Sequence, residues 1–255
     1  MRLRVLGCSG GVGEELRTTS FLLDDDVLID AGSGALDLTL EAMSRIDHVF
    51  VTHSHLDHIL AVPLIVDTVG HLRTSPLTIH SSAATLKALR DHVFNNRIWP
   101  DFAALPRPDA PYVRFSEMQP DQTVTLPGGR RLTPLPANHA VPATGFLLEG
   151  PDCSLAFTGD TTTSDALWER LNQKGGLRYV IIETAFSNRD RGLAIASGHL
   201  CPIMLAEELR KFRGDAEVFI THLKPGDMET TMREVREAIS GATPTMLRKG
   251  MVFDL

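Results

Sequence analysis

Three histidines and an aspartate fall within six residues in the first quarter of the chain. They are His53, His55, Asp57 and His58, and they come shortly after the apolar run 49–51. Neutral imidazole nitrogens and carboxylate oxygens are the ligands that borderline divalent metals such as Zn²⁺ accept. So many polar groups cannot all be satisfied in an apolar core without a strong partner. The segment therefore predicts a metal site and argues against a polar helix start whose histidines simply face water.

Further polar residues stand where later apolar segments end. These candidates are His139, Asp160 and His222. Asp30 also follows an apolar segment and is expected to support the metal ligands. Loops at strand ends can converge on one edge of a sheet, so we expect these residues to meet the early cluster. None of the ligand candidates is a cysteine, and a site of nitrogen and oxygen ligands suits Zn²⁺ but also permits Mn²⁺ or Fe.

The composition is that of an ordinary globular protein. The chain has 255 residues, 43% of them hydrophobic and 22% charged, which excludes a disordered chain, a coiled coil and a collagen-like repeat. Its 25 basic and 32 acidic residues give a net charge of −7, which disfavours nucleic acid as a partner. No apolar run approaches the roughly 18 residues that cross a bilayer, so no membrane partner is expected. Scattered cysteines without a Cys-x-x-Cys motif favour a reducing, cytoplasmic setting.

Short apolar segments bounded by Gly, Asp or Pro predict the strands that must position these residues. The predicted strands are 3–6, 21–23, 27–29, 48–51, 77–80, 132–135, 145–148, 154–157, 179–182 and 218–220. Helical patterns cover residues 83–92, 165–173, 202–212 and 228–239. Strands come first in pairs and later alternate with helices, which predicts a layered α/β architecture with sheets inside and helices outside.

The segment from about Asn95 to Pro120 is expected to be a long loop. Its many prolines oppose a continuous helix and most sheet pairing. Loops of this length in compact domains are usually functional or mobile. The aromatic residues Phe94, just before this segment, and Trp99 and Phe102 within it leave two readings open: they stack against a nucleobase, or they pack in the core or at a dimer contact.

The pattern His-x-His-x-Asp-His, followed by later histidine, aspartate and histidine, resembles the metallo-β-lactamase superfamily. The resemblance implies a four-layer αββα sandwich formed by one domain, residues 1–255, with two divalent metal ions at one edge. It also implies the ligands: His53, His55 and His139 for one metal, Asp57, His58 and His222 for the second, and Asp160 as a bridge between them. Zn²⁺ is the expected metal, with Mn²⁺ or Fe as alternatives, and Asp57 is expected to orient the attacking hydroxide.

Three more stretches resemble the phosphodiesterase branch of this superfamily. They are residues 139–146, 181–186 and 197–202. The resemblance implies that His199 approaches the scissile phosphate and that Glu183 hydrogen-bonds it. A histidine with a pKa near 6.5 can protonate a leaving alkoxide at neutral pH, and a carboxylate partner would raise that pKa and orient the ring. The alternative is that His199 is a structural residue bonded locally near a helix start.

Within that branch, residues 53–59, 92–100 and 198–202 resemble class II cyclic-nucleotide phosphodiesterases. This implies opening of a 3′,5′-cyclic phosphate to a 5′-monophosphate by a metal-bound hydroxide, a small cyclic nucleotide as the partner, and a homodimer. The sequence does not determine which cyclic nucleotide is used.

Three alternatives stay open. A tRNA 3′-processing endonuclease would need a basic, glycine-rich arm, which the sequence lacks. A thioester or lactone hydrolase needs only the metals, and the pair His199 and Glu183 argues against it. A non-catalytic sensor of the same fold is disfavoured because every expected ligand is present.

Overall fold

Two large sheets face each other in this computed structural model, which describes residues 1–239 and 243–255. The first sheet has the order β16 (Val252–Asp254), β1 (Arg2–Gly7), β2 (Ser20–Leu23), β3 (Val27–Ala31), β4 (His48–Phe50), β5 (Leu77–Ser81), β8 (Val113–Glu117). The second has the order β15 (Thr245–Met246), β14 (Glu217–Thr221), β13 (Leu177–Glu183), β12 (Ser154–Phe157), β11 (Thr144–Glu149), β10 (Arg131–Pro136), β9 (Val124–Thr125).

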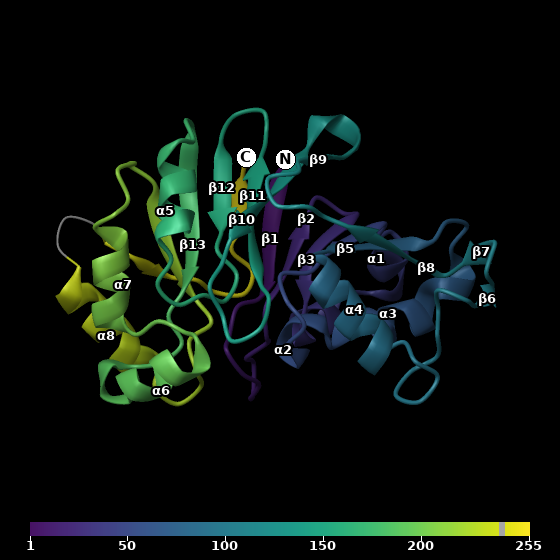
Figure 1. Cartoon of the computed structure of the whole chain (residues 1–255), viewed down its shortest axis with the longest axis horizontal. Helices are drawn as coiled ribbons and strands as arrows, with labels where there is room; N and C mark the ends of the chain where they lie inside the picture. The colour runs from purple at the N-terminus through teal and green to yellow at the C-terminus, as the bar shows by residue number, and fades with distance from the viewer. Residues whose placement is uncertain (240–242) are drawn as a thin grey trace.

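Helices cover the outer face of each sheet (Figure 1). Those on the side of the first sheet are α1 (Leu40–Ser44), α2 (Leu56–Ile59), α3 (Ala61–Val69) and α4 (Ala83–His92). Those on the side of the second are α5 (Asp165–Asn172), α6 (Arg191–Ser197), α7 (Pro202–Leu209) and α8 (Met228–Ala238). The predicted four-layer αββα sandwich is therefore confirmed. None of the helices among the described residues is long and apolar enough to span a membrane.

Aromatic side chains hold the two sheets together. Phe21 and Phe50 from the first sheet and Phe146 and Phe157 from the second are all buried. Phe21 and Phe157 meet edge to face with their centroids 4.9 Å apart, and Phe50 and Phe146 meet at 5.8 Å. Such pairs contribute about 0.5–1.5 kcal/mol each beyond the area they bury. The relative position of the sheets is thus fixed near their centre.

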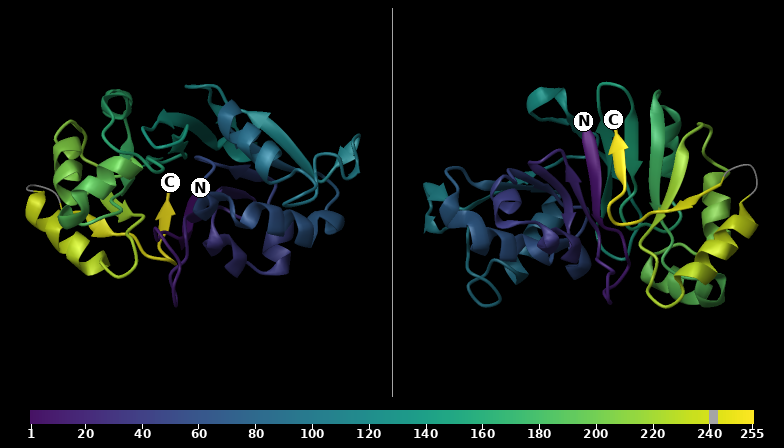
Figure 2. Two further views of the ribbon diagram at one scale, coloured as in Figure 1. Left: turned by 60° about the horizontal axis from the view of Figure 1, so that its bottom comes forward. Right: turned by 180° about the vertical axis from the view of Figure 1, so that it is seen from behind.

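Strand direction brings the polar strand ends to one edge. β3, β4 and β5 are parallel in the first sheet, and β12, β13 and β14 are parallel in the second. Parallel strands present their carboxyl ends at the same edge of a sheet. The opposite edge carries both chain termini, which lie side by side (Figure 2), and the backbone N–H of Leu255 donates to the carbonyl of Met1 at 2.7 Å.

The predicted strands and helices are present, with boundaries within a few residues. The first sheet's helices α1, α2 and α3 and the second's α6 were not predicted. Pro63 suggests a break, but it lies in the first turn of α3, where the helix does not use its N–H.

The prediction that residues 95–120 form only a loop is wrong in part. Val113–Glu117 forms β8, which pairs with β5 and is the edge strand of the first sheet in the described part of the chain. This stretch contains no proline, so its backbone N–H groups can join the ladder. Phe94 and Phe102 are buried in the core between the first sheet and its helices, and the half-buried Trp99 packs against this core. Phe94 and Phe102 therefore build the core and do not form a platform for a base.

Candidate metal centre

The turn after β4 presents the early histidine cluster. His53 lies in this turn, His55 is the residue before the first turn of α2, and Asp57 and His58 belong to α2 itself. The extended backbone of His55 is followed by a helical turn, and this geometry brings the four polar side chains within a few ångströms of one another. The ring of His53 lies 4.6 Å from that of His55 and 4.2 Å from that of His58, measured between centroids.

The first predicted ligand group meets in space. His139 lies in the turn between β10 and β11, yet its Nε2 is 3.1 Å from Nδ1 of His55. The ring of His139 is 4.9 Å from that of His53. The ligand atoms of His53, His55 and His139 all lie within 4.8 Å of one another.

The second predicted group also meets. His222 directly follows β14 and adopts a left-handed backbone conformation with φ of 61°, which turns its ring toward α2. Its Nε2 lies 3.8 Å from a carboxylate oxygen of Asp57, and Nε2 of His58 lies 3.9 Å from the same carboxylate. The ligand atoms of Asp57, His58 and His222 also lie within 4.8 Å of one another.

Asp160 lies between the two groups. Its carboxylate oxygens are 3.3 Å from Nε2 of His58, 3.3 Å from Nδ1 of His222 and 3.8 Å from Nε2 of His53. The side chain is almost completely buried. Every predicted metal ligand is therefore brought to one place, although these residues span positions 53 to 222.

The donor atoms fit divalent cations. Nε2 of His53, Nε2 of His58 and Nδ1 of His222 are buried, and no hydrogen-bond partner serves them within the described part of the chain. A buried polar atom without a partner costs about 1–3 kcal/mol, so such an arrangement needs a compensating ligand. Two ligands on one tetrahedral zinc ion, each about 2.0–2.1 Å from it, are about 3.3 Å apart. The distances of 3.1 and 3.3 Å found here match that separation.

Hydrogen bonds behind the histidines fix which nitrogen faces the site. Nδ1 of His58 donates to Asp30 at 2.7 Å, and Nδ1 of His139 donates to the carbonyl of Gly198 at 2.8 Å. Thr52 Oγ1 donates its one proton to Asp30 and so accepts from Nδ1 of His53 at 3.0 Å. In all three rings the Nε2 lone pair is left for a metal.

Asp30 therefore supports two ligands at once, as its strand-end position predicts. Thr52, by contrast, was not predicted to belong to the site. The sequence feature that could have indicated Thr52 is its position directly before the first histidine of the motif. There its hydroxyl, just after β4, can hydrogen-bond Asp30 of β3.

Replacing Asp30 by asparagine is expected to weaken metal affinity about 10–100-fold, because the amide cannot fix the rings of His53 and His58 as a carboxylate does. Asparagine tolerates the left-handed backbone of residue 30, where φ is 52°. Competition with a chelator measures the affinity. Asp25→Asn makes the same change at an exposed turn position of the same hairpin, and equal effects in the two variants would refute the role of Asp30.

Burial and neighbouring charges set the protonation of the cluster. Burial lowers the pKa of His53 well below its usual value and that of His222 to about 3, so both rings are neutral at neutral pH. Burial alone would raise the pKa of Asp160, but its interactions with His222 and His58 outweigh burial and hold that pKa well below the usual range. Burial would lower the pKa of His58, but the carboxylates of Asp160 and Asp30 outweigh burial and raise that pKa well above its usual value. Without a cation, the carboxylates therefore favour a proton on His58, and a bound metal would take the place of that proton.

A second buried pair borders the cluster. His199 Nδ1 donates to Oε1 of Glu183 at 2.7 Å, and Glu183 is completely buried at the end of β13. Three backbone N–H groups also donate to this carboxylate, those of Thr161, Ala185 and Leu200. Burial lowers the pKa of His199, but Glu183 outweighs burial and raises it above its usual value. The contact with Glu183 thus favours the protonated form of His199 and fixes the orientation of its ring.

His199 lies against the metal ligands. Its ring centroid is 4.8 Å from that of His139 and 5.2 Å from that of His222. The possible ligand atoms of His139, Asp160 and His199 also lie within 4.8 Å of one another, close enough to share a metal ion. Its hydrogen bond to Glu183 leaves Nε2 facing the cluster, either toward a substrate or toward a metal.

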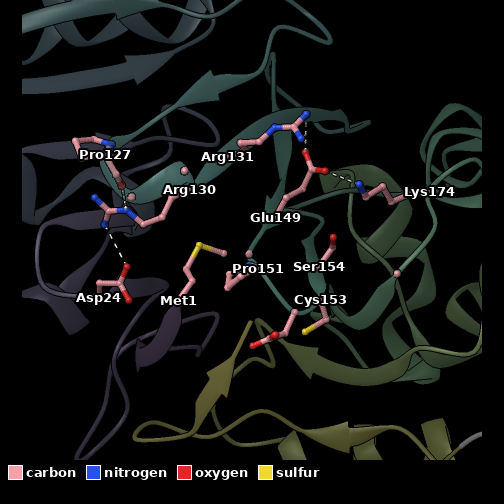
Figure 3. A pocket seen from close by; sticks show the side chains of 15 residues that line it. Met1, Asp24, Pro127, Arg130, Arg131, Glu149, Pro151, Cys153, Ser154 and Lys174 are labelled. Atoms are coloured by element: carbon pink, nitrogen blue, oxygen red, sulfur yellow. Dashed lines mark hydrogen bonds and ion pairs between the residues drawn. The ribbon is translucent and has the colours of Figure 1, made fainter.

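A broad hollow of about 770 Å³ lies at the other edge of the sandwich (Figure 3). Arg131 at the start of β10 and Glu149 at the end of β11 line it, so it lies opposite the turn that carries His139. Its basic side chains are already ion-paired: Arg130 with Asp24, and both Arg131 and Lys174 with Glu149. Among the described residues, none of the side-chain groups that could hold a metal ion includes a residue that lines this hollow.

Two facing sheets flanked by helices, with histidines and aspartates gathered at the carboxyl ends of the strands, define a hydrolase of the metallo-β-lactamase fold. A family model described as the beta-lactamase superfamily domain matches residues 25–239, and the chain belongs to this family. The fold implies a divalent metal at the clustered residues.

Relatives with named activities match most of the chain. The chain is 28% identical over 272 residues to a probable 3′,5′-cyclic-nucleotide phosphodiesterase of Yersinia pestis, covering 86% of this chain and 77% of that protein. It is 31% identical over 163 residues to ribonuclease Z of Halorubrum lacusprofundi, covering 60% and 48%. The crystal structure of unliganded yeast PDE1 superposes over 100% of this chain and 99% of that one, with a TM-score of 0.84 and 18% identity.

Proposed function

We propose that this protein is a dinuclear metal-dependent phosphodiesterase that hydrolyses 3′,5′-cyclic nucleotides to 5′-monophosphates. The observation that carries the proposal is the pair of His199 and Glu183 beside the metal ligands. Hydrolysis of a thioester or lactone at a metal centre does not need such a pair. Breaking the P–O bond of a cyclic phosphate expels a sugar alkoxide, which needs a proton.

In this proposal the two ligand groups hold two cations. His53, His55 and His139 would hold one and Asp57, His58 and His222 the other, with Asp160 shared between them. When bound, two divalent cations supply Lewis acidity and lower the pKa of a bound water toward about 7. Zn²⁺ suits the nitrogen-rich first group best.

The remaining steps fall to the protein's own residues. Asp57, which is partly exposed at the cluster, orients the attacking oxygen. His199 donates a proton from Nε2 to the leaving O3′ of the ribose while Glu183 holds its Nδ1. Glu183 also stabilises the imidazolium form from behind, at a site where burial opposes charge.

The relatives support this substrate class. Two relatives match 86% of the chain: one from Yersinia pestis is named a probable 3′,5′-cyclic-nucleotide phosphodiesterase, and one from Aliivibrio fischeri is named a 3′,5′-cyclic-nucleotide phosphodiesterase. The second candidate is the activity of the ribonuclease Z relatives, which is supported by the 31% identity over part of the chain. The net charge of −7 disfavours that candidate because a pre-tRNA would have to be held by its phosphates.

A hydrolysis panel tests the proposal. The purified protein is expected to contain close to two metal equivalents and to hydrolyse cyclic AMP or cyclic GMP to the 5′-monophosphate in the presence of Zn²⁺, Mn²⁺ or Fe²⁺. Pre-tRNA and a thioester serve as competing substrates in the same panel. Cleavage of pre-tRNA with no opening of cyclic nucleotides would transfer the assignment to the second candidate, and absence of metal after reconstitution would refute both.

The proposal extends to assembly and location. Resemblance to the family suggests a homodimer, which sedimentation in solution tests directly. The free thiols of Cys8, Cys153 and Cys201 are compatible with a reducing, cytoplasmic compartment.

A further inference from the structure

We propose that the cavity beside the turn 137–143 receives the base of the nucleotide. This inference rests on the proposed function, because it assigns a place to the part of the substrate that does not react. The cavity has a volume of about 270 Å³, just below the range of about 300–1,000 Å³ of pockets that hold whole small ligands. It therefore fits a fragment of a ligand.

The cavity adjoins the metal centre. Ala137 and Ala143 line it from the two ends of the turn that carries His139. Two residues of chain span at most about 7 Å, so the wall at Ala137 lies within that distance of His139. On another side, Thr144 lines the cavity and its backbone N–H donates to the carbonyl of Thr52 at 3.0 Å, directly before His53. A group attached to the same ribose as a phosphate at the metals is within reach of this cavity.

The walls suit a flat, neutral ring. Pro134 and Pro136 of β10 and Met118 after β8 supply apolar surface, and a methionine thioether makes favourable contacts with aromatic rings. The hydroxyls in the wall are already used: Ser82 Oγ bonds Thr85 in the cap of α4, and Thr144 Oγ1 donates to the carbonyl of Leu135.

The described residues that line the cavity include no lysine, arginine or histidine that would bind a second phosphate. The charged residue of the lining is Asp121, an exposed carboxylate that is paired with Arg170 at 3.1 Å. The carboxylate of Asp121 can only accept hydrogen bonds, as from a ring N–H or an amino group of a base. Phosphate is thus directed to the metals, and the base is directed to the cavity.

This assignment also resolves the role of the aromatic segment. Because Phe94 and Phe102 are buried in the core, they offer no face to a base. The cavity beside residues 137–143 provides the apolar surface for a base that Phe94 and Phe102 do not provide.

Binding of products to the metal-loaded enzyme tests the inference without turnover. Isothermal titration calorimetry with 5′-AMP, 5′-GMP and ribose 5-phosphate measures how much the base contributes to the binding affinity. We expect the wild-type protein to bind at least one of the two nucleotides at least about 10-fold more tightly than ribose 5-phosphate, the smallest difference typical of an apolar pocket. Ala143→Leu and Ala137→Leu, which narrow the cavity from opposite ends, are expected to remove this preference and to leave binding of ribose 5-phosphate unchanged.

Ala110→Leu is the matched control, because it makes the same change at an exposed position of the small strand β7 (Ala110–Pro111). It is expected to keep the preference for the nucleotide. A wild-type protein that binds ribose 5-phosphate and both nucleotides equally would overturn the inference, as would an unchanged preference in both cavity variants. Failure of the proposed function is separate: it would appear as a wild-type protein that shows the base preference in binding but opens no cyclic nucleotide.

Discussion

Replacing His199 by alanine is expected to lower the turnover of a cyclic nucleotide by about 10²–10⁴-fold while the bound metal stays unchanged, as for loss of a general acid. The reason is that His199 Nε2 faces the cluster while its Nδ1 is held by a buried carboxylate. The loss should depend on the leaving group. A cyclic nucleotide expels an alkoxide that needs a proton, whereas bis(p-nitrophenyl) phosphate expels a phenolate that needs little help. The variant should therefore lose far more activity on the first substrate than on the second.

Glu183→Gln separates positioning from proton donation. The amide oxygen can still accept from Nδ1 of His199, but it no longer carries the charge that raises the pKa of the ring. We expect a loss smaller than that of His199→Ala and with the same dependence on the leaving group. Metal content is measured in both variants. Loss of metal from His199→Ala would show instead that His199 is a ligand with His139 and Asp160, a grouping that the distances allow.

The candidate ligands could be predicted because each stands where a buried strand ends. Their convergence follows from topology: β4, β12 and β14 all finish at the same edge, so residues far apart in sequence become neighbours. His139 follows an antiparallel strand and still reaches this edge, because β10 pairs with β11 along its whole length, from Arg131 to Pro136. The short turn that joins the two strands then holds His139 at the cluster.

The supporting contacts were harder to predict because they depend on tertiary structure. Thr52 connects His53 to Asp30 only because β3 and β4 lie side by side. The carbonyl of Gly198 reaches His139 from a different helix connection, a contact that no local pattern contains. Proline density gave the wrong expectation for β8, since five residues free of proline are enough to form an edge strand.

The cavity proposed for the base also depends on tertiary structure and could not be predicted from the sequence. Its walls come from the ends of β5 and β8, from β10 and from the turn that follows it. These segments carry no common motif, and prolines in strand ends are usually taken as breakers. Pro134 and Pro136 are accommodated because β10 pairs only partly with the short β9 on its outer side.

Replacing Asp160 by asparagine is expected to reduce bound metal from close to two equivalents to one or fewer and to lower turnover by about 10²–10³-fold, the order seen when preorganised charge stabilisation is removed. Asp160 contacts histidines of both ligand groups, at 3.3 Å from His58 and His222 and 3.8 Å from His53. Asparagine keeps the shape of the side chain but loses the negative charge and one acceptor oxygen. A neutral amide cannot offset two dications at a buried position.

Metal analysis and thermal unfolding measure this prediction independently of turnover. Binding to the folded state alone raises stability by RT ln(1 + [L]/Kd), about 4 kcal/mol at a thousandfold excess over Kd. The difference in Tm between metal-loaded and chelated protein should therefore be large for the wild type and small for Asp160→Asn. Asp165→Asn makes the same chemical change at an exposed residue of α5 and should keep the wild-type difference. Two metal equivalents and a full thermal shift in Asp160→Asn would mean that Asp160 does not bridge the two ligand groups, and the dinuclear site would have to be held by another carboxylate.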